Sequence, residues 1–333
     1  KAEVRDLETF EYDLKSIPLL PFGSGKTLKT PKWMSNMGKM VFQGKFSGIA
    51  SHFEAFGLFQ TVAGEIRTDV SFNRDSNNVN QIKGKVYSES FDLGRTLGEK
   101  SLGIISVSGE LDALIKEKKY SLNFSGDIPR FEFRDYAYSN IKMDGEIRDR
   151  VFSGELIVKD PNLVLDFDGE IDFSKPKLQR YDFVADLKQA NLNEIHWINR
   201  DSAIKVSGKV NIGLTGNDIE DMNGILRLDD IVWKGNNKEY KLDSLKLRSV
   251  KQKDREMIVL NSDWFMGKIE GSYNLKEIYP TIINVFSKEI PSIKKAYSLK
   301  ESSKGGNKFR LMFKVYNYDM IHELFTPNFN LSE

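Results

Sequence analysis

A glycine-containing loop, Gly23-Ser-Gly-Lys-Thr27, is the segment of the chain most similar to a nucleotide-binding motif. A Walker A loop also requires a glycine at position 20, where this chain has Leu20, and a helix whose N-terminus binds phosphate. Pro31 would interrupt any helix that began in this loop. The sequence therefore predicts a loop without nucleotide. We expect the neighbouring lysines to lie in solvent, with contact to anionic lipid as the alternative; they are Lys26, Lys29, Lys32 and Lys39.

The densest group of carboxylates comprises Asp160, Asp166, Asp168, Glu170 and Asp172. An EF-hand is excluded, because with Gly169 at the sixth position of such a loop Val164 would occupy the first. In an alternating strand the last four carboxylates share the face opposite the apolar residues, whereas a glycosidase pair needs a concave site. The spacing therefore predicts solvated charges on a strand, with weak calcium binding as the alternative.

Other arrangements typical of enzymes are missing from the sequence. The chain has no cysteine, only three histidines (His52, His196 and His322) far apart, and neither an HExxH nor a GxSxG motif. Its 49 Lys and Arg residues against 48 Asp and Glu residues give a net charge of +1, which argues against a nucleic-acid binder. We expect a protein that is not an enzyme and that binds no metal, no cofactor and no nucleic acid.

The length of 333 residues is typical of about two domains. No apolar run approaches the roughly 18 residues that a membrane-spanning helix needs. The chain begins with Lys-Ala-Glu, so we expect a segment of a longer protein whose targeting signals lie elsewhere.

Alternation of apolar and polar residues dominates the chain, as in Leu165-Asp-Phe-Asp-Gly-Glu-Ile-Asp-Phe173. Such alternation predicts antiparallel strands with one apolar face and one wetted face. A glycine between two apolar residues of the same face recurs at 42–46, 62–66, 82–86, 107–111, 124–128, 143–147, 152–156, 167–171, 206–210, 265–269 and 269–273. Glycine inside a strand marks a bend, a bulge or a close backbone approach, so this recurrence predicts a sheet that curls around its apolar face.

Four segments are expected. Residues 1–40 form an irregular linker, 41–275 a quasi-repetitive β-groove, 276–300 an amphipathic helical insertion, and 301–333 a further β-groove unit. The fold class is all-β, an elongated, curled antiparallel sheet folded over into an open groove, with few short helices.

Short helical segments are predicted at 280–290 and 292–299, where Pro291 separates two stretches with one apolar stripe, and at Phe91–Leu97. A turn that begins at Asn191 should carry Leu192, Ile195 and His196 inward. Residues 181–208 and 309–332 share one order of strand, cap, apolar turn and strand, which favours an array of repeated units.

The chain resembles the TamB/AsmA-like family in its Bacteroidetes form. The resemblance is carried by residues 141–173 and by Asp186-Leu-Lys-Gln-Ala-Asn-Leu192, with Asp160-Pro-Asn162 and Asp166-Phe-Asp-Gly169 as the most specific parts. Phe42–Gly48, Thr61–Ile66 and Phe91–Gly94 fit the same pattern.

The resemblance implies an open β-groove in the periplasm of the cell envelope, in a full-length protein anchored to the inner membrane. It also implies phospholipid transport between the two membranes, an outer-membrane partner of the TamA type, and no catalytic residues.

Three hypotheses follow. The apolar face conducts phospholipid; the strand edges act as a scaffold or chaperone for assembling outer-membrane proteins; or the faces form a dry, adhesin-like sandwich. We favour the first, because each exposed methylene of a lipid costs about 0.8 kcal/mol in water. Alternation predicts these lining residues: Phe124, Ile128, Met143, Ile147, Phe152, Leu156, Phe167, Ile171, Phe183 and Leu187. We also predict that the helix at 280–299 caps one end of the groove.

Overall fold

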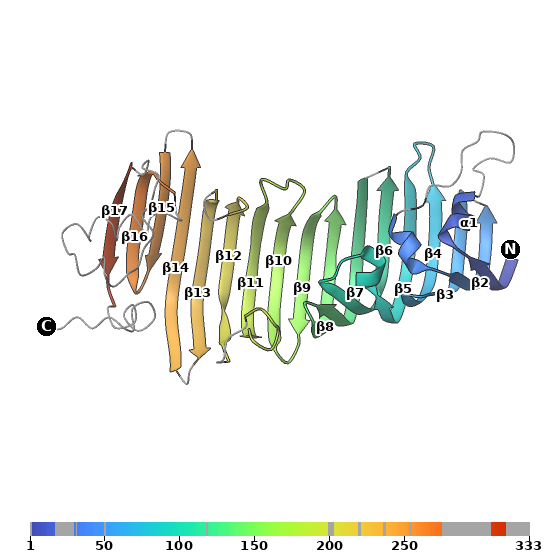
Figure 1. Cartoon of the computed structure of the whole chain (residues 1–333), viewed down its shortest axis with the longest axis horizontal. Coiled ribbons are helices and arrows are strands. Elements are labelled where there is room, and N and C mark those ends of the chain that lie inside the picture. The colour runs from blue at the N-terminus through green and yellow to red at the C-terminus, as the bar shows by residue number, and fades with distance from the viewer. Residues whose placement is uncertain are drawn as a thin grey trace. The chain divides into compact units, whose positions relative to one another are not determined.

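The computed structural model describes residues 2–16, 30, 32–49, 51–117, 119–198, 203–218, 221–235, 238–252, 255–274 and 308–317. Within these ranges it contains seventeen strands, two short α-helices and one 3₁₀ helix. Each strand pairs with the next one along the chain in one open antiparallel sheet (Figure 1). The predicted all-β class and the few short helices are confirmed. The curl into a groove is not shown by the structure and stays a prediction.

The bounds of the elements are β1 (Ala2–Thr9), α1 (Glu11–Ser16), η1 (Lys32–Met37), β2 (Met40–Ile49), β3 (His52–Thr61), β4 (Gly64–Arg74), β5 (Asn80–Asp92), α2 (Leu93–Leu97), β6 (Leu102–Lys116), β7 (Lys119–Phe133), β8 (Tyr136–Arg148), β9 (Val151–Lys159), β10 (Leu163–Asp172), β11 (Arg180–Asn191), β12 (Lys205–Thr215), β13 (Asn223–Gly235), β14 (Lys238–Gln252), β15 (Arg255–Ser262), β16 (Phe265–Ser272) and β17 (Lys308–Val315).

The chain divides into two compact units. The first unit comprises Lys1–Gly169, Asp186–Val206 and Gly235–Asn237, and the second comprises Glu170–Ala185, Ser207–Lys234 and Lys238–Glu333. The predicted four-segment division is not tested by the structure and stays a prediction, apart from the character of residues 1–40.

The expectation of an irregular segment at residues 1–40 is wrong for Ala2–Thr9, which forms β1 and pairs antiparallel with β2. A shift in register between Val4 and Leu7 breaks this pairing. The same irregularity explains why the segment shows no alternation in the sequence, since a bulge changes which residues share a face.

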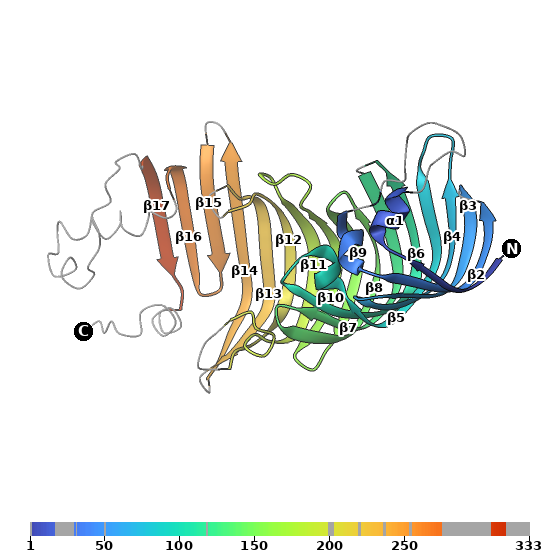
Figure 2. The same cartoon turned by 45° about the vertical axis from the view of Figure 1, so that its right-hand side comes forward.

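Two buried clusters form the core of the first unit. One consists of Met37, Met40, Ala63 and Phe91, against which side chains from α1, η1 and β6 pack. The other consists of Tyr138, Ile141, Val158, Ala190 and Ile195. Figure 2 shows the short helices against one face of the sheet. The predicted helical turn after Phe91 is confirmed as α2, whose N-cap Asp92 accepts a hydrogen bond from the backbone N–H of Arg95 at 2.7 Å.

In the second unit, β14 to β17 pair in antiparallel register. Trp264 and Ile269 are buried there, and β17 exposes Leu311, Met312 and Phe313. No helix in the part of the chain that the structure describes is long and apolar enough to cross a membrane.

Three predictions fall outside the described residues. They are the loop at Gly23–Thr27, the helical segments at 280–290 and 292–299, and the second half of the internal match after residue 317.

Candidate functional site on the apolar face of β2 to β9

The apolar face of β2 to β9 is continuous, because the eight strands of the first unit pair so that residues of one kind lie opposite one another. For example, Phe53 lies opposite Phe72, and Leu122 lies opposite Ile147. We number five rows of residues along this face, with breaks in row 1 at bulges. Row 1 contains Phe42, Phe59, Ile66, Ser88, Val107, Ile128, Ile141 and Val158.

Row 2 contains Gly44, Gly57, Thr68, Val86, Gly109, Gly126, Met143 and Leu156, and row 3 contains Phe46, Ala55, Val70, Gly84, Leu111, Phe124, Gly145 and Gly154. Row 4 contains Gly48, Phe53, Phe72, Ile82, Ala113, Leu122, Ile147 and Phe152. Row 5 contains Arg74, Asn80, Ile115 and Tyr120. Rows 2 and 3 hold six of the recurring glycines, namely Gly44, Gly84, Gly109, Gly126, Gly145 and Gly154.

Three glycines of rows 2 and 3, Gly109, Gly126 and Gly145, provide space for aromatic rings. Gly109 and Gly126 lie opposite each other, and a Cβ atom built on Gly109 would meet Cζ of Phe124 at 2.7 Å. A Cβ on Gly145 would lie 3.1 Å from Cε2 of Phe152. The rings therefore lie across the glycines rather than standing out from the sheet. A close approach is one of the three features that a glycine inside a strand can mark, and it is present at Gly109, Gly126 and Gly145; the curl predicted from the recurrence stays a prediction.

The capped end of the face is the end that includes row 1. Ile141 and Val158 are 6% and 3% exposed, because Ile195 and its turn pack against them. The predicted turn after Asn191 is present, and the backbone N–H of Ile195 donates to the carbonyl of Asn191 at 3.1 Å. Leu192 and Ile195 face inward as predicted.

The prediction for His196 is wrong, because this side chain is exposed. His196 has a positive φ of 58°, which ends the regular turn. Its Nδ1 lies 3.2 Å from the carbonyl of Arg134. The neighbouring Trp197 donates its indole N–H to the hydroxyl of Tyr138 at 3.0 Å. The turn is thus held by polar contacts as well as by Ile195.

Asp160 is the centre of a buried polar network at the capped end. Its carboxylate accepts hydrogen bonds from the Tyr136 hydroxyl at 2.6 Å, the Asn162 backbone N–H at 2.8 Å, and the hydroxyl and N–H of Ser139 at 2.8 and 3.0 Å. Burial raises the pKa of Asp160, but these hydrogen bonds outweigh it and the pKa lies below its usual value. Burial and the Asp160 carboxylate raise the pKa of Tyr136 to about 12.

This network also connects to the turn, since Asn191 donates to the side chain of Asn162 at 2.5 Å and to its carbonyl through the backbone at 2.8 Å. The prediction that Asp160 is solvated is therefore wrong: it is 2% exposed. Asp160 ends one strand rather than lying within it, so the alternation argument does not apply to it.

The other four carboxylates behave differently. Asp168 is exposed as predicted, whereas Asp166, Glu170 and Asp172 are partly buried. Asp166 forms an ion pair with Lys188. Among the residues that the structure describes, no cluster of side chains has the composition of a metal site.

The open end of the face is the end that includes rows 4 and 5. The rings of Phe46, Phe53 and Phe72 follow one another, with centroids 4.9 and 4.8 Å apart. All three are only half-buried, as are Leu122 and Ile147 of row 4. Apolar side chains thus stay partly accessible at the open end, whereas Ser88, Ile141 and Val158 of row 1 are buried at the capped end.

The ten predicted lining residues are all half-buried. Six of them lie in the five rows: Phe124, Ile128, Met143, Ile147, Phe152 and Leu156. Phe167 contacts Phe152, with ring centroids 5.9 Å apart, and Leu187 packs against the capped-end cluster. Ile171 and Phe183 belong to the second unit. Their role in lining a groove stays a prediction.

Sequence reasoning missed the aromatic residues of β2 to β4, namely Phe46, Phe53 and Phe72. The signal that could have found them is the same alternation of apolar and polar residues that identified Phe124 and Ile147. In Phe53-Glu-Ala-Phe-Gly-Leu-Phe59 it is masked by Phe56 and Leu58, which lie on the polar face.

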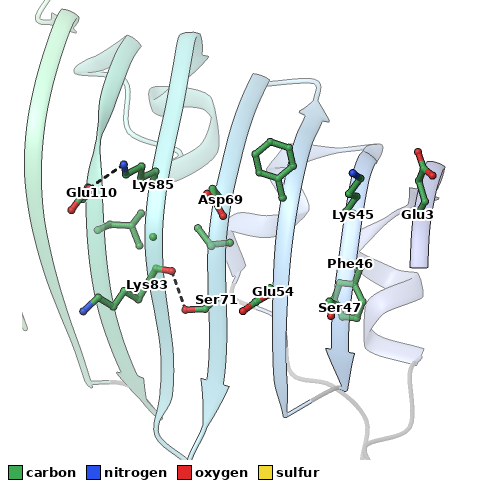
Figure 3. Close-up of a pocket in the computed structure, with 14 residues that line it drawn as sticks. Glu3, Lys45, Phe46, Ser47, Glu54, Asp69, Ser71, Lys83, Lys85 and Glu110 are labelled. Atoms are coloured by element: carbon green, nitrogen blue, oxygen red, sulfur yellow. Dashed lines mark hydrogen bonds and ion pairs between the residues drawn. The ribbon is translucent and has the colours of Figure 1, made fainter. Parts of the chain in front are cut away.

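A hollow of about 820 Å³ lies on the polar face of β1 to β6 (Figure 3). Lys45, Phe56, Asp69, Lys85 and Glu110 form one cross-strand row in it, and Lys85 lies 3.5 Å from Glu110. Phe56 is 61% exposed between its charged neighbours. None of the ten predicted residues lines this hollow. Alternating charges stabilise neighbouring strands and do not suit hydrocarbon.

Comparisons with family models, with curated proteins and with solved structures found no match to this chain.

Proposed function

We propose that the apolar face of β2 to β9 binds the acyl chains of phospholipids and conducts them along the sheet. The observation that supports this most directly is the half-buried state of the apolar side chains of rows 3 and 4, from the middle of the face towards the open end. A face this apolar normally packs against protein, as it does at the capped end. Hydrocarbon is the ligand whose transfer from water such a face favours, by about 0.8 kcal/mol per methylene.

The shape of the side chains also favours an acyl chain. Rings that lie across glycines, as Phe124 does on Gly109, give a shallow apolar surface along which an acyl chain can slide. The proposal includes the curl of the sheet around the lipid. It also includes the location suggested by the family resemblance: the periplasm of a diderm envelope, with an inner-membrane anchor and a TamA-like partner.

The experiment is lipid extraction and mass spectrometry of the purified chain, expressed in a diderm bacterium. We expect co-purified phospholipid in the natural sequence. Ile147→Asp places a charge in row 4 and should lower the bound lipid by about tenfold while the strands stay folded, since tenfold corresponds to about 1.4 kcal/mol.

Ser71→Asp is the control, because Ser71 is exposed on the polar face between Glu54 and Lys83. It should leave lipid unchanged. Absence of lipid from the natural chain, or unfolding of Ile147→Asp with no lipid in either protein, contradicts the proposal and favours a closed core.

A further inference from the structure

Arg74 is the one charged residue in the five rows of the apolar face. It lies in row 5, at the end of β4 and beyond Phe72 of row 4. Arg74 is partly buried, unlike most of the lysines and arginines that the structure describes, which are exposed. A guanidinium at the rim of an apolar face requires an explanation, because burial of an unpaired charge costs stability.

The contacts of Arg74 hold it in place without neutralising it. Its Nε donates to Oδ1 of Asn80 at 2.7 Å, and its backbone N–H donates to the carbonyl of Ser51 at 2.8 Å. The adjacent Asp75 uses Oδ1 to accept the backbone N–H groups of Asn77 and Val79, both at 2.8 Å.

Among the described residues no carboxylate lies within ion-pair distance of Arg74. The two terminal nitrogens of the guanidinium therefore remain available as donors. This fork matches two oxygens of a phosphate, which Arg binds through paired hydrogen bonds.

We propose that Arg74 binds the phosphate of a phospholipid whose acyl chains lie on rows 3 and 4. This inference rests on the proposed function and adds a direction to it: the headgroup lies at the open end. The capped end is unsuitable for a phosphate, because Ile141 and Val158 are buried there and the buried Asp160 is a carboxylate.

The distances along the strand fit such a lipid. From Arg74 to Ile66 of row 1 the strand rises about 27 Å, at about 3.4 Å per residue. One leaflet of hydrocarbon is about 15 Å thick, half of a core of about 30 Å. A chain whose phosphate is at Arg74 therefore covers rows 4 and 3 and ends before the capped end.

The test compares two probes with the same acyl chains, dioleoyl phosphatidylglycerol and dioleoylglycerol, offered together to the purified chain. Native mass spectrometry measures the ratio of the two bound lipids. We expect the natural chain to favour the phospholipid by about tenfold. Arg74→Gln should bring the ratio close to one without reducing dioleoylglycerol, and Arg74→Lys should give an intermediate ratio, since it keeps the charge and loses the fork.

Arg67→Gln is the matched control in the same strand. Arg67 is exposed on the opposite face, with its guanidinium 5.6 Å from the ring centroid of Tyr87, so the ratio should not change. A preference for phospholipid that survives Arg74→Gln overturns the inference, as does a natural chain that binds both probes equally. A natural chain that binds neither probe overturns the proposed function and the inference together.

Discussion

The two ends of the apolar face differ in how far their side chains are covered by the rest of the chain. At the capped end, Ile141 and Val158 are covered by a turn and held by a buried carboxylate network around Asp160. At the open end of the same strands, Ile147 and Phe152 are half-buried. The side chains at the two ends are similar, so their chemistry does not explain the difference. What differs is whether the chain provides a segment to cover them.

This comparison suggests that the capped end stabilises the fold and the open end is available to a ligand. A substitution at the capped end should then lower the free energy of unfolding strongly. The matching substitution at the open end should affect stability little and ligand binding more.

Asp160→Ala should have the largest effect on stability. The substitution leaves the Tyr136 hydroxyl and the N–H groups of Ser139 and Asn162 without their acceptor, which should cost about 4 kcal/mol. Asp168→Ala, at an exposed carboxylate of β10, should cost less than about 0.5 kcal/mol. Urea unfolding monitored by circular dichroism measures both. Equal losses would show that the Asp160 network does not stabilise the capped end.

The next effect compares two isoleucines of β8. Ile141→Ala should cost about 3 kcal/mol, because the side chain is 6% exposed and leaves a cavity. Ile147→Ala should cost about 1 kcal/mol, since its side chain is only half-buried. The same urea titration serves for both, and a loss at Ile147 as large as that at Ile141 would mean that the open end is packed as protein.

A smaller effect is expected in the middle of the face. Gly109→Ala forces the new Cβ against the Phe124 ring and the carbonyl of Ser125, each 2.7 Å away, and should cost about 2 kcal/mol. Gly213→Ala meets nothing within 4 Å and should be within about 0.5 kcal/mol of neutral. A neutral Gly109→Ala, measured by thermal unfolding, would show that the ring does not need the space above the glycine.

The smallest effect is the pH dependence that Tyr136 adds to the free energy of unfolding. Its pKa is raised to about 12 in the folded chain, by burial and by Asp160, so the folded state holds the phenol proton more tightly than the unfolded state does. The corresponding stabilisation is fully present below the ordinary pKa of about 10 and is lost as the pH rises towards 12.

The free energy of unfolding should fall by at most about 1.4 kcal/mol per pH unit through the titration of Tyr136. Tyr136→Phe should flatten the loss of stability between about pH 10 and about pH 11 relative to the natural chain, as measured by urea midpoints. Parallel curves for the two proteins would contradict this account of Tyr136.

The alternation of the sequence was sufficient to predict the strands and the shared face, because a period of two places Phe124 and Ile128 on one side of any antiparallel sheet. The capped end was only partly predictable: Ile195 follows from its turn, but the burial of Asp160 depends on Tyr136 and Ser139 of another strand. Such contacts depend on register, which the alternation alone does not determine.

The position of Arg74 also depends on strand register and could not be predicted from the alternation. In the sequence it is one of 49 basic residues, at the end of an alternating run. Only the pairing with Asn80 of β5 places it on the apolar face without a carboxylate partner. The recurring glycines do not determine a curl of the sheet, because glycine permits a bend without requiring one.

Photo-crosslinking at Phe152 tests the central claim most directly. A benzophenone amino acid in place of Phe152 lies in row 4, whereas the same probe at Ser153 lies on the polar face of the same strand. After irradiation of the chain in the cells that produce it, mass spectrometry should find adducts of phospholipid mass at position 152 and few or none at 153. Adducts at position 152 that join only this chain or a protein client, with no lipid, would contradict the account.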